Sequence, residues 1–203
     1  ALGAVLPTLP VDTRMALVTY NDTVHFYRPS SESGGSVGFF VSPDLADVAL
    51  PLPPEVLLGS LEDVHAALAL VTELFNTTKR PDAAFGAAIH AAHQLLGPTG
   101  GRLLAFQHSQ PALGPLKLTQ RDDARSYGTD KEKALYAPAE PSWTALAAAL
   151  AASHVCASTF HLTTGNFVDI ASMAALSRTT GGQLYYYPEA LPEQRDIWGP
   201  KLE

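Results

Sequence analysis

The chain is poor in charged residues, in cysteine and in long apolar runs. Only 16% of its 203 residues are Asp, Glu, Lys or Arg, whereas 46% are hydrophobic, so the chain can bury a sizeable core. Such a shortage of charge predicts that part of the surface is covered by a partner or by further chain. No run of about 18 apolar residues occurs, which argues against a membrane-spanning helix in this sequence.

Basic residues and cysteine are scarcer still. The 13 Lys and Arg residues are outnumbered by 20 Asp and Glu residues, and the net charge of −7 argues against nucleic acid as the main partner. The one cysteine, Cys156, cannot form a disulfide within the chain, which fits a reducing compartment. Because Cys156 lies in an apolar run, we expect a buried structural thiol.

Motifs that would identify an enzyme or a metal site are missing. Ser109 follows an expected strand, but no G-x-S-x-G motif and no glycine-rich phosphate-binding loop is present. His90 and His93 lie three residues apart, as a metal pair would, yet no third ligand stands at a supporting spacing. Asp169 could bind a divalent cation or cap a helix, and capping explains it without a metal.

Stretches typical of strands alternate with stretches typical of helices. Short strands flank Asn21 and Asp22, as in a hairpin, and Ser60 with Asp63 indicates the start of a helix that runs to about Phe75. Further strands are expected at 38–41, 102–108, 155–162 and 183–187, and further helices at 82–96, 143–152 and 170–179. The alternation predicts an α/β fold with a mostly parallel sheet, to which the hairpin adds one antiparallel strand.

One stretch is densely charged: eight of the sixteen residues in RDDARSYGTDKEKALY, at 121–136, are charged. It can be a solvated crossover loop whose ions pair with one another. Alternatively, it can be a recognition surface on which Arg121 binds a carboxylate, because arginine forms bidentate pairs with carboxylates. The residues alone leave both interpretations open.

Five separated segments carry a resemblance to a known family. In order they are VTYNDTVHFY, DLADVALPLP, GGRLLAFQHSQPALG, KLTQRDDARSYGTDKEKALY and FVDIASMAALSRTTGGQLYYYP. Together they resemble the trunk domain of the cargo-adaptor subunit of the COPII inner coat, from about Val11 to Pro188. The resemblance divides the chain into a partial trunk domain, residues 1–188, and a divergent tail, residues 189–203.

The resemblance implies a fold of the von Willebrand factor A type, a mostly parallel sheet with flanking helices, incomplete at the N-terminus because its first core strand is expected before Ala1. It implies a non-catalytic adaptor that binds sorting signals of membrane cargo, including SNAREs, and pairs with the GTPase-activating partner subunit of the inner coat. The implied place is the cytoplasm, at endoplasmic reticulum exit sites and in the COPII coat, with peripheral membrane association. No cofactor is expected, since the family's zinc belongs to an upstream module outside this chain.

The resemblance also nominates cargo-binding residues. Arg121 matches the segment that supplies basic residues for acidic sorting signals, and Leu176 lies on the helix that supplies an apolar residue. Lys117 and Arg125 are further candidates. A guanidinium would bind the carboxylate of the signal, and an apolar floor would receive its leucine. The alternative is a metal-dependent ligand-binding domain of the same fold, which would need an upstream D-x-S-x-S motif and Mg²⁺-dependent binding.

Overall fold

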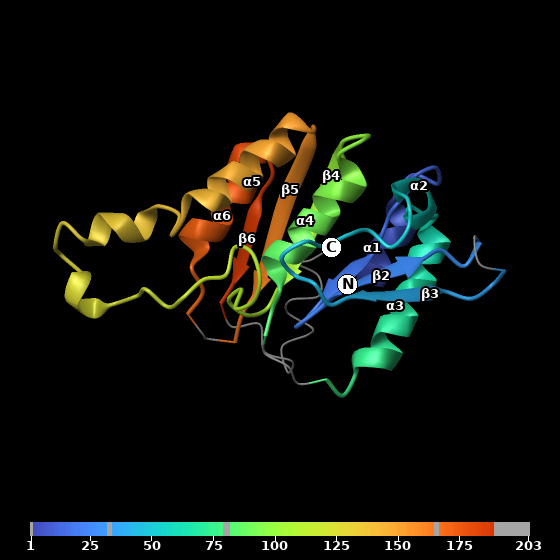
Figure 1. Ribbon diagram of the computed structural model, residues 1–203, viewed down its shortest axis with the longest axis horizontal. Helices are drawn as coiled ribbons and strands as arrows, with labels where there is room; N and C mark the ends of the chain where they lie inside the picture. Colours follow the sequence, from blue (N-terminus) through green and yellow to red (C-terminus); the bar gives the residue numbers. More distant parts are fainter. Residues whose placement is uncertain (1, 32–33, 79–81, 165–166, 189–203) are drawn as a thin grey trace.

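The computed structural model describes residues 2–31, 34–78, 82–164 and 167–188, so the predicted tail at 189–203 lies outside the described residues. Within these ranges the strands form two three-stranded sheets, which lie side by side in Figure 1. The first sheet is antiparallel, in the order β1 (Val18–Tyr20), β2 (Val24–Arg28), β3 (Gly38–Ser42). The second is parallel, in the order β4 (Gly101–Gln107), β5 (Val155–Leu162), β6 (Leu184–Tyr187).

The hairpin is confirmed, but its expected place on the parallel sheet is wrong. Asn21 shapes the turn, because its side-chain Oδ1 accepts from the Thr23 N–H at 3.0 Å. β1 and β4 are edge strands of different sheets, and the Tyr20 hydroxyl links them by donating to the Phe106 carbonyl at 2.7 Å. The Tyr20 side chain spans the gap between the two strands, and this gap is wider than the spacing at which strands form a backbone ladder.

Helices cover both sheets. α4 (Phe85–Leu96), α5 (Pro141–Ala152) and α6 (Ile170–Thr180) pack on one face of the parallel sheet. α3 (Leu61–Phe75) packs through Phe75 against His25 of the antiparallel sheet, with ring centroids 5.1 Å apart. The short helices are α1 (Leu2–Val5), α2 (Pro54–Leu57) and the 3-10 helix η1 (Leu6–Thr8). An α/β fold with a parallel sheet and flanking helices is therefore confirmed.

The helix starts follow local hydrogen bonding. Ser60 and Asp63 form the predicted capping box of α3, with each side chain accepting from the backbone N–H of the other. α4 begins at Phe85, later than the expected residue 82, because the Ala84 N–H donates to the Asn21 carbonyl at 2.8 Å and ties that residue to the hairpin.

α4 joins the two halves of the core. Its Phe85 and Ile89 pack with Trp143 of α5 and with strands of the parallel sheet. Its small residues Ala87 and Ala91 pack against the antiparallel sheet. Each fully buried large apolar side chain contributes about 1.5–3 kcal/mol. One helix thus holds two sheets that share no backbone ladder.

The other face of the parallel sheet carries a row of stacked rings. Phe106, Phe160 and Tyr185 follow one another across β4, β5 and β6, with centroids 4.7 Å apart at each step. Cys156 lies on the same face of β5 as Phe160, four residues earlier. The thiol is partly exposed, so the prediction of full burial is wrong, because Cys156 points away from the helices.

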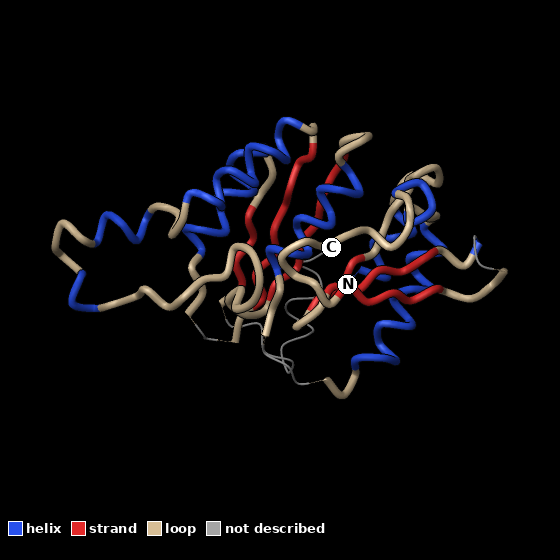
Figure 2. The backbone as a smooth tube through the Cα atoms, in the orientation of Figure 1, coloured by secondary structure: helices blue, strands red, loops and turns tan. Residues whose placement is uncertain are grey.

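The connection between β4 and α5 stands out from the body of the fold, at the left of Figures 1 and 2. We call residues 122–136 the arm. It contains two 3-10 helices, η3 (Ala124–Ser126) and η4 (Glu132–Tyr136), and no buried residue. The arm therefore lacks a hydrophobic core of its own.

Candidate functional site

Arg121 and Asp169 lie together at the carboxyl edge of the parallel sheet, at the start of α6. β5 ends at Leu162, and Asp169 then caps α6. β4 ends at Gln107, and the chain that follows brings Arg121 to the first turn of α6. Ligands of parallel sheets usually bind at this edge. The predicted cap at Asp169 is confirmed.

Arg121 is bound from several directions. Its Nε and Nη2 donate to the two carboxylate oxygens of Asp169 at 2.6 and 2.9 Å, a bidentate pair. Its Nη1 donates to the Ala134 carbonyl at 2.7 Å, and Nη2 also donates to the Ala137 carbonyl at 2.6 Å. Ala134 lies in the arm and Ala137 directly follows it. Arg121 therefore joins both ends of the arm to α6.

Asp169 is an ionised group inside the fold. It is 3% exposed, and besides Arg121 it accepts from the Ser172 N–H at 3.1 Å and the Ser172 hydroxyl at 2.8 Å. Burial raises the pKa of Asp169, but the hydrogen bonds from Arg121 and Ser172 outweigh burial and hold the pKa below its usual value of 3.8. The carboxylate is thus charged at neutral pH and neutralised by the guanidinium.

The other cargo-binding candidates lie in contrasting surroundings. Leu176 lies one turn beyond Ser172 on α6, but it is 0% exposed and belongs to the hydrophobic core. Lys117 and Arg125 are exposed on either side of Arg121 in the chain. The structure therefore brings Arg121 and Leu176 to the same helix, with Arg121 at its surface and Leu176 beneath.

Sequence reasoning missed the pairing itself. Arg121 and Asp169 were each singled out, one as a peptide ligand and the other as a cap, and no local pattern connects residues 48 positions apart. The carbonyls of Ala134 and Ala137, which also accept from Arg121, were missed as well, because backbone acceptors have no sequence signature. Only the packing of the connection against α6 brings these groups together.

Support for a metal site is weak where the structure can test it. His93 Nε2 lies 2.9 Å from the Ser153 hydroxyl at the end of α5, so this histidine links two helices. In the described ranges of the chain no cluster of three or more His, Cys, Asp or Glu residues could hold a metal ion. Both oxygens of Asp169 already accept from Arg121. The metal-dependent alternative is therefore not favoured.

His161 is a buried histidine that sequence reasoning did not single out. It lies near the end of β5 with 0% exposure, and among the described residues neither ring nitrogen has a hydrogen-bond partner. Burial lowers the pKa of His161 to about 4. The ring is thus neutral at physiological pH and cannot supply a positive charge to the nearby edge.

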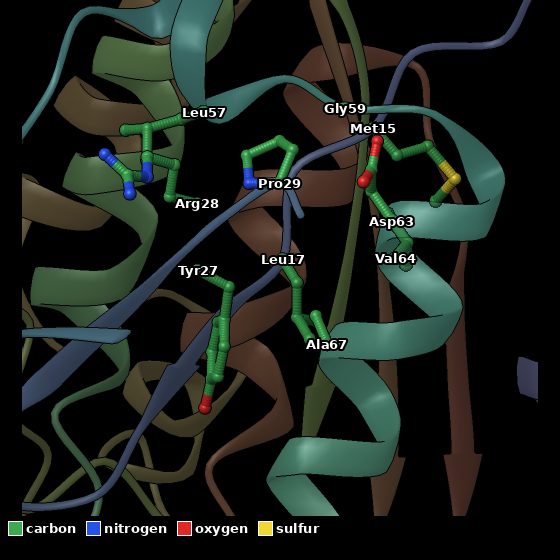
Figure 3. A pocket seen from close by; sticks show the side chains of 10 residues that line it. All are labelled: Met15, Leu17, Tyr27, Arg28, Pro29, Leu57, Gly59, Asp63, Val64 and Ala67. Atoms are coloured by element: carbon green, nitrogen blue, oxygen red, sulfur yellow. The ribbon is translucent and has the colours of Figure 1, made fainter. Parts of the chain in front are cut away.

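A small cavity lies between β2 and α3, where Tyr27, Met15 and Asp63 are among its lining residues (Figure 3). Its volume of about 10 Å³ leaves room for one water molecule at most. The Asp63 carboxylate accepts from the Ser30 hydroxyl at 2.9 Å and the Ser31 N–H at 3.1 Å, in addition to capping α3. This acid therefore holds a turn and a helix start together.

The described helices include none that is both long enough and apolar enough to cross a membrane.

Comparisons with known proteins agree with this architecture. A family model described as the Sec23/Sec24 trunk domain matches residues 1–196. Protein transport protein SEC24 A of Arabidopsis thaliana is 37% identical over 201 residues, covering 97% of the chain and 19% of that protein. Protein transport protein Sec24A of Bos taurus is 32% identical over 203 residues, covering 98% and 18%.

A solved structure is similar as well. The crystal structure of the human COPII-coat protein Sec24c aligns with a TM-score of 0.84 and 29% sequence identity, covering 93% of the chain and 26% of that structure. This similarity confirms the expected trunk fold. The chain spans about a fifth of the length of these curated relatives.

Proposed function

Because the chain belongs to the Sec23/Sec24 trunk domain family, we propose that it serves as the trunk portion of a non-catalytic cargo adaptor in the COPII coat. The observation that carries the proposal is the family match along nearly the whole chain, supported by the similarity to a Sec24c trunk. The adaptor acts in transport from the endoplasmic reticulum to the Golgi. It works on the cytoplasmic side, at exit sites, and associates with the membrane peripherally through the coat.

The proposal includes two kinds of protein partner. One is the partner inner-coat subunit with the GTPase-activating role, which pairs with the trunk. The other is the set of cytosolic sorting signals on membrane cargo and SNAREs. The role needs no cofactor within the chain.

We place the acidic sorting signal at the start of α6, over Arg121. The exposed Lys117 and Arg125 supply charges that a peptide carboxylate can reach directly. Arg121 holds the surface in shape, because its guanidinium already binds Asp169 and two carbonyls. Leu176 supports the floor from below, as it has no exposed surface. Two exposed cations favour a moderate, salt-sensitive affinity.

A peptide titration tests this site. The probe is a synthetic peptide with two glutamates and one leucine, titrated calorimetrically into the purified protein at low and at physiological salt. Replacing both Lys117 and Arg125 by Ala should weaken binding about tenfold at low salt, since each exposed charge contributes up to about 1 kcal/mol. The matched control is Arg102→Ala, an exposed cation at the opposite end of β4. Equal affinities of wild type and double variant would reject the assignment.

A further inference from the structure

β3 forms one margin of the antiparallel sheet (Figure 1). In the described part of the chain it pairs with β2 alone, in a register that places Phe40 opposite Phe26. In an antiparallel ladder every second residue directs its N–H and C=O to the neighbouring strand, and the residues between direct theirs away from it. The outer side of β3 therefore presents backbone donors and acceptors at the spacing that a further strand needs.

The sequence of β3 lacks the features that usually protect an edge strand. Its five residues, GFFVS, include no charged residue and no proline, and all of them pair with β2 in one continuous register without a bulge. An edge of this kind joins other strands readily. The ligand that fits it is an extended peptide, because only an extended chain can continue the backbone ladder.

An apolar surface lies beside this edge. Phe39 and Val41 are 37% and 50% exposed, and as alternate residues they project from the same face of β3. The ring centroid of Phe39 lies 6.3 Å from that of Phe75 at the end of α3, and the neighbouring Leu74 is 43% exposed. Figure 1 shows the last turns of α3 running past this margin of the sheet. A strand added to β3 would direct every second side chain toward these apolar groups.

The charges at the two ends of β3 differ in sign. Asp22 lies in the hairpin turn beside the last residue of β3, and Asp44 follows that residue closely in the chain. Asp47 belongs to the same turn as Asp44, because its N–H donates to Asp44 Oδ1 at 3.3 Å. At the opposite end, Arg28 of β2 pairs with the first residue of β3. A strand antiparallel to β3 begins at the acidic end, so basic residues are expected at its N-terminus.

We propose that the outer edge of β3 binds an extended peptide as a further antiparallel strand, with apolar side chains at alternate positions and lysine or arginine at its N-terminal end. The backbone ladder supplies affinity, and Phe39, Val41 and Phe75 select apolar side chains on one face of the peptide. The site lies on the antiparallel sheet and its acidic end disfavours an acidic sorting signal. It is therefore separate from the surface around Arg121 and does not depend on the proposed function.

A peptide titration tests the site. The probe is the synthetic peptide Lys-Lys-Thr-Val-Thr-Val-Thr, acetylated and amidated so that only its lysines are charged, titrated calorimetrically into the purified protein at low salt. Val41→Lys should weaken binding about tenfold or more, because it removes an apolar contact and adds a charge that repels the peptide. The matched control is Leu104→Lys, since Leu104 is 42% exposed on β4, an edge strand of the other sheet. This control should bind like wild type, and equal affinities of Val41→Lys and wild type would reject the site.

The reversed peptide, Thr-Val-Thr-Val-Thr-Lys-Lys, tests direction and charge. As an antiparallel strand it brings its lysines to Arg28, and it reaches the aspartates only as a parallel strand, which pairs less stably. It should bind several-fold more weakly than the first peptide. Replacing Asp44 and Asp47 by Asn should reduce this difference. Equal affinities of the two peptides for the wild-type protein would overturn the proposal.

Hydrogen exchange measures the ladder on the wild-type protein, free of any effect of a substitution on folding. The first peptide should slow the exchange of those β3 amides that face the outer edge, and it should leave the amides of β5 unchanged. Unchanged exchange in β3 at saturating peptide would show that the peptide binds elsewhere and would overturn the proposal. No binding at about 1 mM peptide would overturn it as well.

Sedimentation of the protein alone tests a second copy of the chain as the occupant. Each copy carries a net charge of −7, which opposes self-association. We therefore expect a monomer. Dimers that Val41→Lys abolishes would show that a second copy occupies the edge, and the proposal would be wrong.

Discussion

Removing the guanidinium of Arg121 should destabilise the protein and release the arm. In Arg121→Ala the Asp169 carboxylate loses a bidentate pair and stays buried, with hydrogen bonds only from Ser172 among the partners described above. Removing the partner of a fully buried charge costs about 3–5 kcal/mol. The two hydrogen bonds from Ser172 remain, so we expect the unfolding free energy to fall by about 2–3 kcal/mol. For a domain of this size that corresponds to a fall in melting temperature of about 5–10 °C.

The pH dependence of this loss identifies its cause. The pKa of Asp169 lies below its usual value of 3.8 in the folded protein, because the hydrogen bonds from Arg121 and Ser172 outweigh burial. A lowered carboxyl pKa adds stability above the unfolded pKa, and that stability is lost as the pH falls through the folded pKa. The difference between wild type and Arg121→Ala should therefore be full at pH 7 and shrink below about pH 4.

Urea unfolding of both proteins at several pH values provides the assay, with Arg125→Ala as the matched control in the exposed arm. The control should change the unfolding free energy by no more than about 0.5 kcal/mol. Amide exchange in the arm should accelerate only in Arg121→Ala. A loss below about 0.5 kcal/mol, or one that stays constant from pH 7 to pH 3, would show that the pair does not hold the arm.

Two other predictions concern buried polar groups. Asp63→Ala should lower the unfolding free energy by about 2–4 kcal/mol, because it removes a helix cap and leaves buried donors unpaired. Glu62→Ala, on the exposed side of the same turn, should change the unfolding free energy little. Equal losses for the two variants in chemical denaturation would contradict the role of Asp63. His161 has a folded pKa of about 4 and an unfolded value of 6.5, so the unfolded chain binds more protons between these values, and stability should fall by about 2 kcal/mol from pH 7 to pH 5. His161→Phe should remove this fall, and a persisting pH dependence in the variant would assign it to another group.

The elements of the fold could be read from the sequence because their signals are local. The capping pair Ser60–Asp63 and the alternation of strand and helix stretches depend on neighbours within a few residues, and the structure bears them out. The resemblance to the trunk family likewise came from contiguous segments such as GTDKEKALY. The family match along the chain confirms it.

The arrangement of the site depended on contacts between distant residues. Arg121 could be named as a candidate from its segment. Its hydrogen bonds to Asp169 and to the Ala134 and Ala137 carbonyls follow from the path of the β4–α5 connection over α6. The burial of Leu176 follows from which face of α6 meets the sheet. Periodicity shows that a helix has an apolar face, yet it does not say which members of that face reach solvent.

The sequence by itself determined the α/β class, the hairpin, the helix caps and the family, because these depend on local patterns and on runs of matching residues. Only the tertiary structure decided that the strands form two sheets joined through α4 and Tyr20, and that Cys156 faces away from the helices. It also decided that the charged stretch stands out as an arm fixed by Arg121. Each of these features depends on a contact between residues far apart in the chain, which local propensities do not encode.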